Sequence, residues 1–467
     1  MKKMTKLFFI YLLLFSVGVQ FAQEKKDEFK PSVTIGGTLY TGWNDNFGNN
    51  NLTTSFDTTK PDITQPFGFA PKLNQFEVSQ NSFFLERAYI NVLASLAPNI
   101  KGRITPDIVQ ITGTTTATAQ YALEIKYAWI DWTAFKNDNG LALDFTLGVI
   151  PNRWIGINER YWGYRGFAKT LTDYSYVTSV STTSANGKIT GATWNTGSYF
   201  SSADLGLEAM VTGPKGFGEL YLNIFSGNGY KNLGNSTRWK DFMGTLFIHP
   251  LADNLAKKMK ASKTGRIQGI ADVTLGGFVY MGELGKGEIG FNGVSGTTGY
   301  PLASTQYKRN RFGGMLSAKY NFKDNGFVKI GGEFSVQQNQ DPGKTILTPV
   351  ADSALTYTST GLSLYLEFNP PVKELNDKLM LVARYDMFDP KTPSPNATLI
   401  TNGLINFNNT TDKQSLLLLG LAYKPVKAAT LGLTYQAVTY QQPFVTKRDG
   451  TTSKTTSHLI VHGILEF

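Results

Sequence analysis

The chain has 467 residues, with 45 Lys and Arg against 35 Asp and Glu, a formal net charge of +10 and no cysteine. The lack of cysteine excludes disulfide scaffolds, thiolate metal sites and cysteine nucleophiles. Lys/Arg-dense stripes with interleaved aromatic residues do not occur, which argues against a nucleic-acid partner.

The N-terminus has the pattern of an export signal. Three lysines precede the apolar stretch Leu7–Val19, which is too short to span a bilayer, and small residues follow it. This pattern predicts a secretory signal peptide over residues 1–23, cleaved after Ala22 or Gln23. An uncleaved anchor helix is the alternative. Removal of the predicted signal peptide lowers the net charge of the chain to +7. After residue 23, no stretch is long and apolar enough for a membrane helix.

Residues 24–467 contain no linker, composition shift or repeat, so we expect a single domain. Runs with period-two alternation recur throughout, and short turns such as Pro98–Asn99 and Asn137–Gly140 alternate with long polar connections. This arrangement predicts an all-β fold, a transmembrane antiparallel β-barrel of about sixteen strands with its short turns on the periplasmic side. One short-side connection, His249–Arg266, is long and basic, and we expect either a short helix or two further strands there.

Charged residues fall mostly on one face of each predicted strand. We expect that face to line the lumen, because a charge facing lipid near the midplane costs roughly 2–4 kcal/mol. Carboxylates such as Asp144, Glu333, Glu367 and Asp386 offset the cations on this face. The set is compatible with a basic lumen wall and with a network of neutralising ion pairs. The expected inward cations are Arg87, Arg103, Arg309, Arg311, Lys319, Lys329 and Arg384.

Two strands illustrate the expected faces. The last strand, Ser457–Phe467, should turn Leu459 and Phe467 toward lipid and His462 into the lumen, and it should close the barrel against Val33–Trp43. In the run 76–94, one face is expected to carry Phe84, Ala88, Ile90 and Val92, and the other to carry Arg87, Tyr89 and Asn91.

The longest connection, Pro151–Ser202, is the candidate for the pore constriction. Its first part combines cations with aromatic residues, and charged rings with aromatic constrictions set the selectivity of pores. We therefore expect this loop to fold into the lumen as a narrow eyelet; an external loop packed on the barrel rim is the alternative. The candidate constriction residues are Arg153, Glu159, Arg160, Tyr161, Arg165, Lys169 and Asp173.

Histidine chemistry is not expected. Only His249, His458 and His462 occur, and on a strand the last two would lie ~13 Å apart, too far to share a zinc ion whose ligands bind at about 2 Å. No nucleophile-elbow, zinc-protease or phosphate-loop motif is present. We therefore predict no enzymatic activity, no catalytic residue, no metal and no cofactor.

Four segments resemble the phosphate-selective porin family (porins O and P). Asn81–Asn91 is similar to its "F-x-x-R-A-x-I" strand, Ile125–Trp132 to its "A-y-v-d" strand, Leu147–Pro151 to its "G-x-x-x-P" lead into the constriction loop, and Leu381–Asp386 to its "a-R-y-d" strand. The resemblance implies a sixteen-stranded, trimeric outer-membrane channel with its third loop constricting the pore, and a possible preference for phosphate.

Together these features predict a porin in the outer membrane of a Gram-negative cell. It would allow passive diffusion of small hydrophilic solutes with a preference for anions, and its partners would be outer-membrane lipid, those solutes and two further copies of the chain. A closed barrel that serves as a structural or assembly subunit is the alternative.

Overall fold

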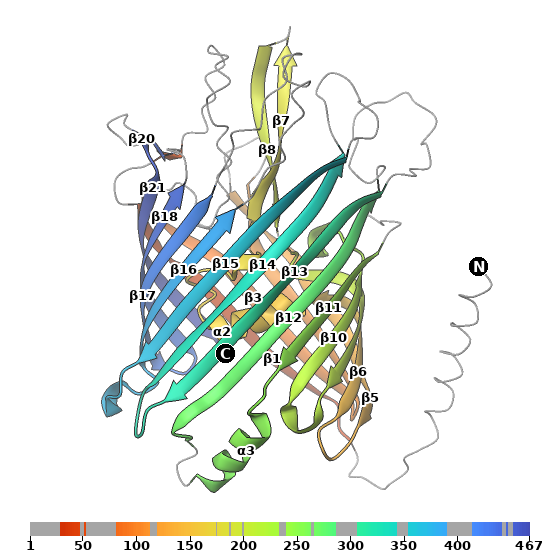
Figure 1. Cartoon of the computed structure of the whole chain (residues 1–467), viewed down its shortest axis with the longest axis vertical. Coiled ribbons are helices and arrows are strands. Elements are labelled where there is room, and N and C mark those ends of the chain that lie inside the picture. The colour runs from red at the N-terminus through yellow and green to blue at the C-terminus, as the bar shows by residue number, and fades with distance from the viewer. Residues whose placement is uncertain are drawn as a thin grey trace, which may run out of the picture.

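The computed structural model describes residues 29–46, 51–52, 81–112, 119–173, 175–185, 188–198, 200–232, 240–262, 266–285, 306–342, 354–389, 413–440, 445–446 and 452–467. Within these residues, sixteen strands close into an antiparallel barrel (Figure 1). The predicted fold class is therefore confirmed. The barrel strands are β1 (Ser32–Asn46), β3 (Asn81–Ala97), β4 (Ile100–Thr112), β5 (Ala119–Lys136), β6 (Ala142–Pro151), β9 (Ala203–Thr212), β10 (Gly218–Phe225), β11 (Asp241–Ile248), β12 (Gly269–Gly285), β13 (Gln306–Asn321), β14 (Phe327–Pro342), β15 (Ala354–Asn369), β16 (Leu379–Asp389), β17 (Gln414–Val426), β18 (Ala429–Tyr440) and β21 (Thr455–Glu466).

The barrel closes where the first strand meets the last. Strands β1 and β21 pair antiparallel from Thr38 opposite Glu466 to Asn46 opposite His458. Closure pairs both edges of the sheet, so no row of backbone donors and acceptors stays open at this seam. The predicted contact of the last strand with the first is confirmed.

The connections sort by length as predicted. Short turns join β3 to β4, β5 to β6, β9 to β10, β13 to β14, β15 to β16 and β17 to β18, all at the end where β1 begins and β21 ends. The basic connection at this end contains the helix α3 (Ala252–Ala261), so the expected helix is confirmed. Its Lys257 Nζ lies 2.7 Å from Asp253 Oδ2, one helical turn away. No helix among the described residues is long and apolar enough to cross a membrane.

Additional short elements lie in the connections at the opposite end or at turns. The hairpin formed by β7 (Ser175–Ala185) and β8 (Lys188–Ser198) rises beyond the barrel rim (Figure 1). The others are β2 (Asn51–Leu52), β19 (Val445–Thr446) and β20 (Thr452–Ser453), together with the 3-10 turns η1 (Leu171–Asp173), η2 (Pro214–Gly216), η3 (Tyr230–Asn232) and η4 (Lys373–Leu375). The predicted signal peptide, residues 1–23, lies outside the described residues.

Alternation separates the two faces of the wall. In β13, Phe312 and Leu316 point outward and are 43% and 47% exposed, whereas Arg311 and Ser317 point inward and are buried. The same exposure pattern, with large apolar residues on the outside, continues through β12, β16, β17 and β21. An apolar exterior around a polar interior is the pattern of a barrel whose surroundings are hydrocarbon.

The predicted faces of β3 are wrong for one residue. Tyr40 of β1 lies opposite Arg87, but the next residue, Thr41, lies opposite Leu85, so Glu86 is the extra residue of a β-bulge. The bulge shifts the alternation, and Phe84 therefore faces the lumen instead of lipid. Its ring centroid lies 6.4 Å from that of His462.

A second bulge occurs in β5. Thr105 pairs with Tyr127, but Pro106 pairs with Ile125, which leaves Lys126 as the extra residue. A bulge turns two consecutive side chains to one face of a sheet. Lys126 is accordingly buried on the lumen side together with its neighbour Tyr127. Each of the two bulges thus adds an inward charge that strict alternation does not provide.

Candidate functional site

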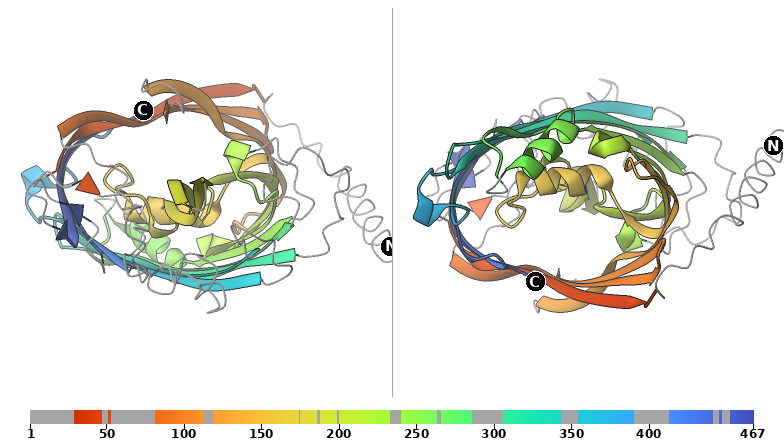
Figure 2. Two further views of the ribbon diagram at one scale, coloured as in Figure 1. Left: turned by 90° about the horizontal axis from the view of Figure 1, so that it is seen from above. Right: turned by 90° about the horizontal axis from the view of Figure 1, so that it is seen from below.

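Residues 152–173 leave the wall after β6 and pass through the barrel interior (Figure 2). They contain the helix α2 (Arg153–Trp162), which Asn152 and Gly163 cap. The Asn152 side chain accepts a hydrogen bond from Ile155 N at 3.3 Å. At the other end, Gly163 has φ 78° and its N–H donates to Glu159 O at 2.8 Å. Both devices satisfy backbone groups that a helix end leaves open.

An aromatic contact fixes the first half of this segment to the wall. The Trp154 ring is fully buried, 5.8 Å from the Phe247 ring of β11 and 4.5 Å from the Phe278 ring of β12. Offset and tilted aromatic pairs at these distances stabilise a structure beyond their buried area. The helix is therefore held against the β11–β12 side of the lumen.

The second half is fixed to a different part of the wall. The Phe167 ring is fully buried, with its centroid 4.7 Å from that of His462 in β21. It fills the space over Gly432 of β18, where an added Cβ would lie 2.2 Å from the ring. Further along, Leu171 N donates to Glu333 Oε1 of β14 at 2.6 Å. The segment thus contacts strands on both sides of β14.

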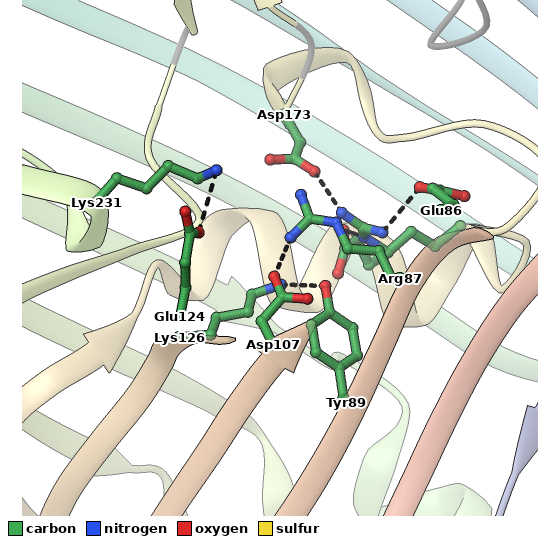
Figure 3. Close-up of polar contacts among 10 residues, drawn as sticks. Glu86, Arg87, Tyr89, Asp107, Glu124, Lys126, Asp173 and Lys231 are labelled. Carbon is green, nitrogen blue, oxygen red and sulfur yellow. Dashed lines mark hydrogen bonds and ion pairs between the residues drawn. The ribbon is translucent and has the colours of Figure 1, made fainter. Parts of the chain in front are cut away.

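Arg165 connects the inward segment to a third part of the wall. Its Nη2 lies 3.0 Å from Asp173 Oδ2 and its Nε contacts Glu159, both within the segment. Its Nη1 lies 3.5 Å from Glu86 Oε1, the bulge residue of β3. Two of these partners, Asp173 and Glu86, are labelled in Figure 3, each with a dashed line to its contact. Burial raises the pKa of Asp173, but Arg165 and Lys169 outweigh burial and leave that pKa below its ordinary value.

Cations and anions alternate on the wall beside Arg165 (Figure 3). Arg87 forms an ion pair with the buried Asp107 of β4. Lys126 Nζ donates to Tyr89 Oη at 2.7 Å, and Lys231 Nζ lies 3.2 Å from Glu124 Oε2. A solute at this level would meet fixed charges of both signs.

The other predicted constriction residues lie on α2 or just after it. Arg153 Nε lies 2.9 Å from Glu208 Oε1 of β9, and the Tyr161 hydroxyl accepts from Thr274 Oγ1 at 2.6 Å. Arg160 is exposed and Lys169 is half-buried. The structure thus places all seven candidates inside the barrel, but only Glu159, Arg165 and Asp173 meet in one cluster.

The predicted lumen cations divide into two groups. Four form ion pairs, namely Arg87 with Asp107, Arg309 with Asp241, Lys329 with Glu367 and Arg384 with Asp386. The others contact neutral groups: Arg103 donates to Asn91 and Thr105, Arg311 lies beside the rings of Phe200 and Tyr280, and Lys319 lies over the Phe327 ring. Carboxylates therefore neutralise four of the seven predicted inward cations, and the predicted basic wall of the lumen is only partly basic.

Several charged residues of the site were not predicted. Glu86 and Lys126 are the extra residues of the two bulges. In the sequence, a bulge of this kind is indicated where a charged residue directly precedes another inward-facing polar residue, as in Glu86-Arg87 and Lys126-Tyr127. Asp107 was also not predicted; it lies in β4, which extends from Ile100 to Thr112.

Each of the three histidines contacts a neutral side chain, and His249 also lies near a carboxylate, with its Nε2 4.0 Å from Glu219 Oε2. His458 Nδ1 lies 3.1 Å from Asn44 Oδ1, and His462 Nε2 lies 2.9 Å from Thr434 Oγ1. His249 Nδ1 lies 2.9 Å from Thr274 Oγ1. In the part of the chain that the structure describes, no three His, Asp or Glu side chains are grouped to hold a metal ion.

No family model and no curated protein matches the sequence. Solved structures do match. OmpTΔL8, a loop-deletion mutant of the Vibrio cholerae outer-membrane protein OmpT, is 11% identical over 94% of this chain and 99% of that chain, with a TM-score of 0.43. OprB of Pseudomonas putida is 10% identical over 93% of both chains, with a TM-score of 0.48. A porin is 10% identical over 93% of this chain and 100% of that one, with a TM-score of 0.39. Membership of the phosphate-selective porin family stays a prediction.

Proposed function

We propose that this protein is a channel in the outer membrane of a Gram-negative cell, through which small hydrophilic solutes diffuse passively. The observation that carries the proposal is the opposite character of the two faces of one closed wall. Large apolar side chains are exposed outside, as Phe312 is, while charged side chains such as Arg87 and Asp107 face inward. A polar lumen inside an apolar exterior suits a water-filled path.

The inward segment, residues 152–173, is proposed to be the constriction. Support comes from its contacts with β9, β11, β12, β14, β21 and β3, which hold it across the lumen. The solute path would then run between α2 and the wall that carries Glu86, Arg87 and Lys126. Fixed charges of both signs at a constriction orient polar solutes and favour hydrated molecules over apolar ones.

A modest preference for anions is proposed from the net charge of +7 that the chain carries without residues 1–23. The ion pairs in the lumen keep this preference for anions small, because four of the seven predicted inward cations are neutralised by carboxylates. A preference for phosphate would need cations arranged along the solute path, and only the family resemblance suggests such a preference.

Planar-bilayer recording tests the channel. The purified, refolded chain should give ohmic current steps in KCl, and a salt gradient should give a reversal potential that favours chloride slightly. The absence of any current would overturn the proposed function, and a reversal potential favouring potassium would overturn the anion preference alone.

Two buried clusters pack the inward segment against the wall, and this packing favours one alternative, a closed barrel that serves as a structural or assembly subunit. Such a protein would conduct no current and would copurify with partners. We further propose a homotrimer and a cleaved signal peptide over residues 1–23. An SDS-resistant species of three times the monomer mass, and N-terminal sequencing of the mature protein, test these two points.

A further inference from the structure

A cavity of about 180 Å³ opens off the lumen beside the base of the inward segment. Asn152 lies at its edge, and β12 and β13 supply its wall through Tyr280, Arg309 and Arg311. It lies away from the Arg165 cluster and was not predicted from the sequence. On this measure of volume a single water molecule needs only about 10–15 Å³, so the cavity suits a small organic molecule better than a single inorganic ion.

The two arginines of the cavity are held in different ways. Arg309 Nη2 lies 3.2 Å from Asp241 Oδ2, and the same carboxylate accepts from the Tyr280 hydroxyl. The Arg311 guanidinium carbon lies 5.1 Å from the Phe200 ring centroid and 5.0 Å from that of Tyr280. The two rings contact each other, with their centroids 5.3 Å apart, so the guanidinium lies beside both of them. The ring faces attract the cation, and the planar guanidinium carries its N–H donors along its edge.

The carboxylate that lines the cavity already has donors. Asp204 Oδ2 accepts from Gly227 N at 3.0 Å and from Gly229 N at 3.2 Å. Its Oδ1 accepts from Leu205 N at 2.7 Å and from the Ser226 hydroxyl at 2.5 Å. Four hydrogen bonds disperse its charge, so its repulsion of an anion is weakened. Asp241 does not line the cavity.

We propose that this cavity is a binding site for a small organic acid, whose carboxylate binds Arg311 while its carbon atoms lie against Phe200, Phe225 and Tyr280. A planar carboxylate matches the edge of a guanidinium, which donates two parallel hydrogen bonds to it. The aromatic side chains supply the apolar contact that a bare oxyanion would not use. The inference deepens the proposed channel function by naming a class of solute, and it rests on that function only for the route by which the solute arrives.

Calorimetry on the refolded full-length protein tests the site with three probes: lactate, its neutral amide lactamide, and inorganic phosphate. Lactate should bind at least about tenfold more tightly than lactamide, because a charge-assisted hydrogen bond is lost in the amide. Phosphate should bind more weakly than lactate. Equal binding of lactate and lactamide would overturn the proposal, and tighter binding of phosphate would overturn the assignment to organic acids.

Arg311→Gln should weaken lactate binding by about tenfold or more. The matched control is Arg103→Gln, which removes an inward arginine that also stacks on a tyrosine, Tyr127, at 4.6 Å. This control should bind lactate within about twofold of the unmodified protein. Heat-modifiable electrophoretic mobility checks the fold of each variant. If Arg311→Gln does not fold, Arg311→Lys replaces it, because lysine keeps the positive charge but lacks the two parallel N–H donors. Unchanged lactate binding by either variant would overturn the site.

Bilayer recording on the same samples separates the two proposals. Ohmic current combined with lactate binding that does not depend on Arg311 would overturn the proposed site but not the proposed channel. Arg311-dependent lactate binding by a protein that carries no current would overturn the channel and leave the site standing.

Discussion

Phe467 and Gly37 exchange both of their backbone hydrogen bonds across the seam of the barrel. Gly37 N donates to Phe467 O at 2.8 Å, and Phe467 N donates to Gly37 O at 3.0 Å. The Phe467 ring, which is 80% exposed, lies directly over Gly37, where an added Cβ would be 2.5 Å from it. This pair extends the ladder between β1 and β21 by one step beyond Glu466.

The two glycines at this seam should differ in their tolerance of alanine. A Cβ on Gly36 would lie 2.6 Å from Phe467 O, the backbone atom that accepts from Gly37 N. Gly36→Ala should therefore destabilise the barrel by about 1–3 kcal/mol through this lost pairing. Gly37→Ala should cost under about 0.5 kcal/mol, because the exposed Phe467 ring is free to turn away. Urea unfolding in liposomes measures both, and equal losses would contradict the prediction.

Removal of Arg165 should release the inward segment. Arg165→Ala leaves Glu86, Glu159 and Asp173 close together without their shared cation, and breaking a buried ion pair costs about 3–5 kcal/mol. We expect larger current fluctuations and a shift of the reversal potential toward cations. Arg160→Ala is the control, because Arg160 is exposed on the same segment. The same fluctuations in both variants would mean that loss of charge, and not loss of the Arg165 contacts, is responsible.

The contact of Arg165 with Asp173 should withstand mild acid. The pKa of Asp173 is lowered from its ordinary value of 3.8, because Arg165 and Lys169 outweigh its burial. A lowered carboxyl pKa stabilises the folded arrangement above the ordinary pKa, and that stabilisation disappears as the pH falls through the lowered pKa. The part of the current fluctuations that depends on Asp173 should therefore grow only below about pH 4. Asp173→Asn should fluctuate already at pH 7. A transition near pH 6 that Asp173→Asn abolishes would contradict this account.

Period-two alternation was enough to predict the barrel, its count of about sixteen strands and its seam. The helix α3 was predicted from the helical spacing of Leu251, Leu255 and Met259, with two further strands as the alternative. Each strand repeats the same pattern over 8 to 18 residues, and the penalty for a charge in lipid keeps that pattern regular. The charged cluster was harder to predict. Glu86 and Lys126 face inward only because of bulges, and the partners of Arg165 come from residues up to 79 positions away, a pairing that depends on how the inward segment crosses the lumen.

Deletion of single residues in β3 should test the bulge directly. With the bulge, Phe84, Glu86 and Arg87 face inward while Leu85 faces outward. Deleting Glu86 leaves Phe84 inward, Leu85 outward and Arg87 inward, which is regular alternation. The variant should therefore assemble in the membrane at normal levels, and its reversal potential should shift toward chloride because an inward carboxylate is gone.

Deleting Leu85 instead is the matched control, since the strand becomes shorter by the same single residue. Glu86 then occupies the outward position between Phe84 and Arg87, where a carboxylate faces hydrocarbon at a cost of about 1–3 kcal/mol. Unless the strand shifts its register, this variant should refold less completely, as heat-modifiable mobility and urea unfolding would show. Equal stability of the two deletions would mean that the extra residue of β3 does not set which side chains enter the lumen.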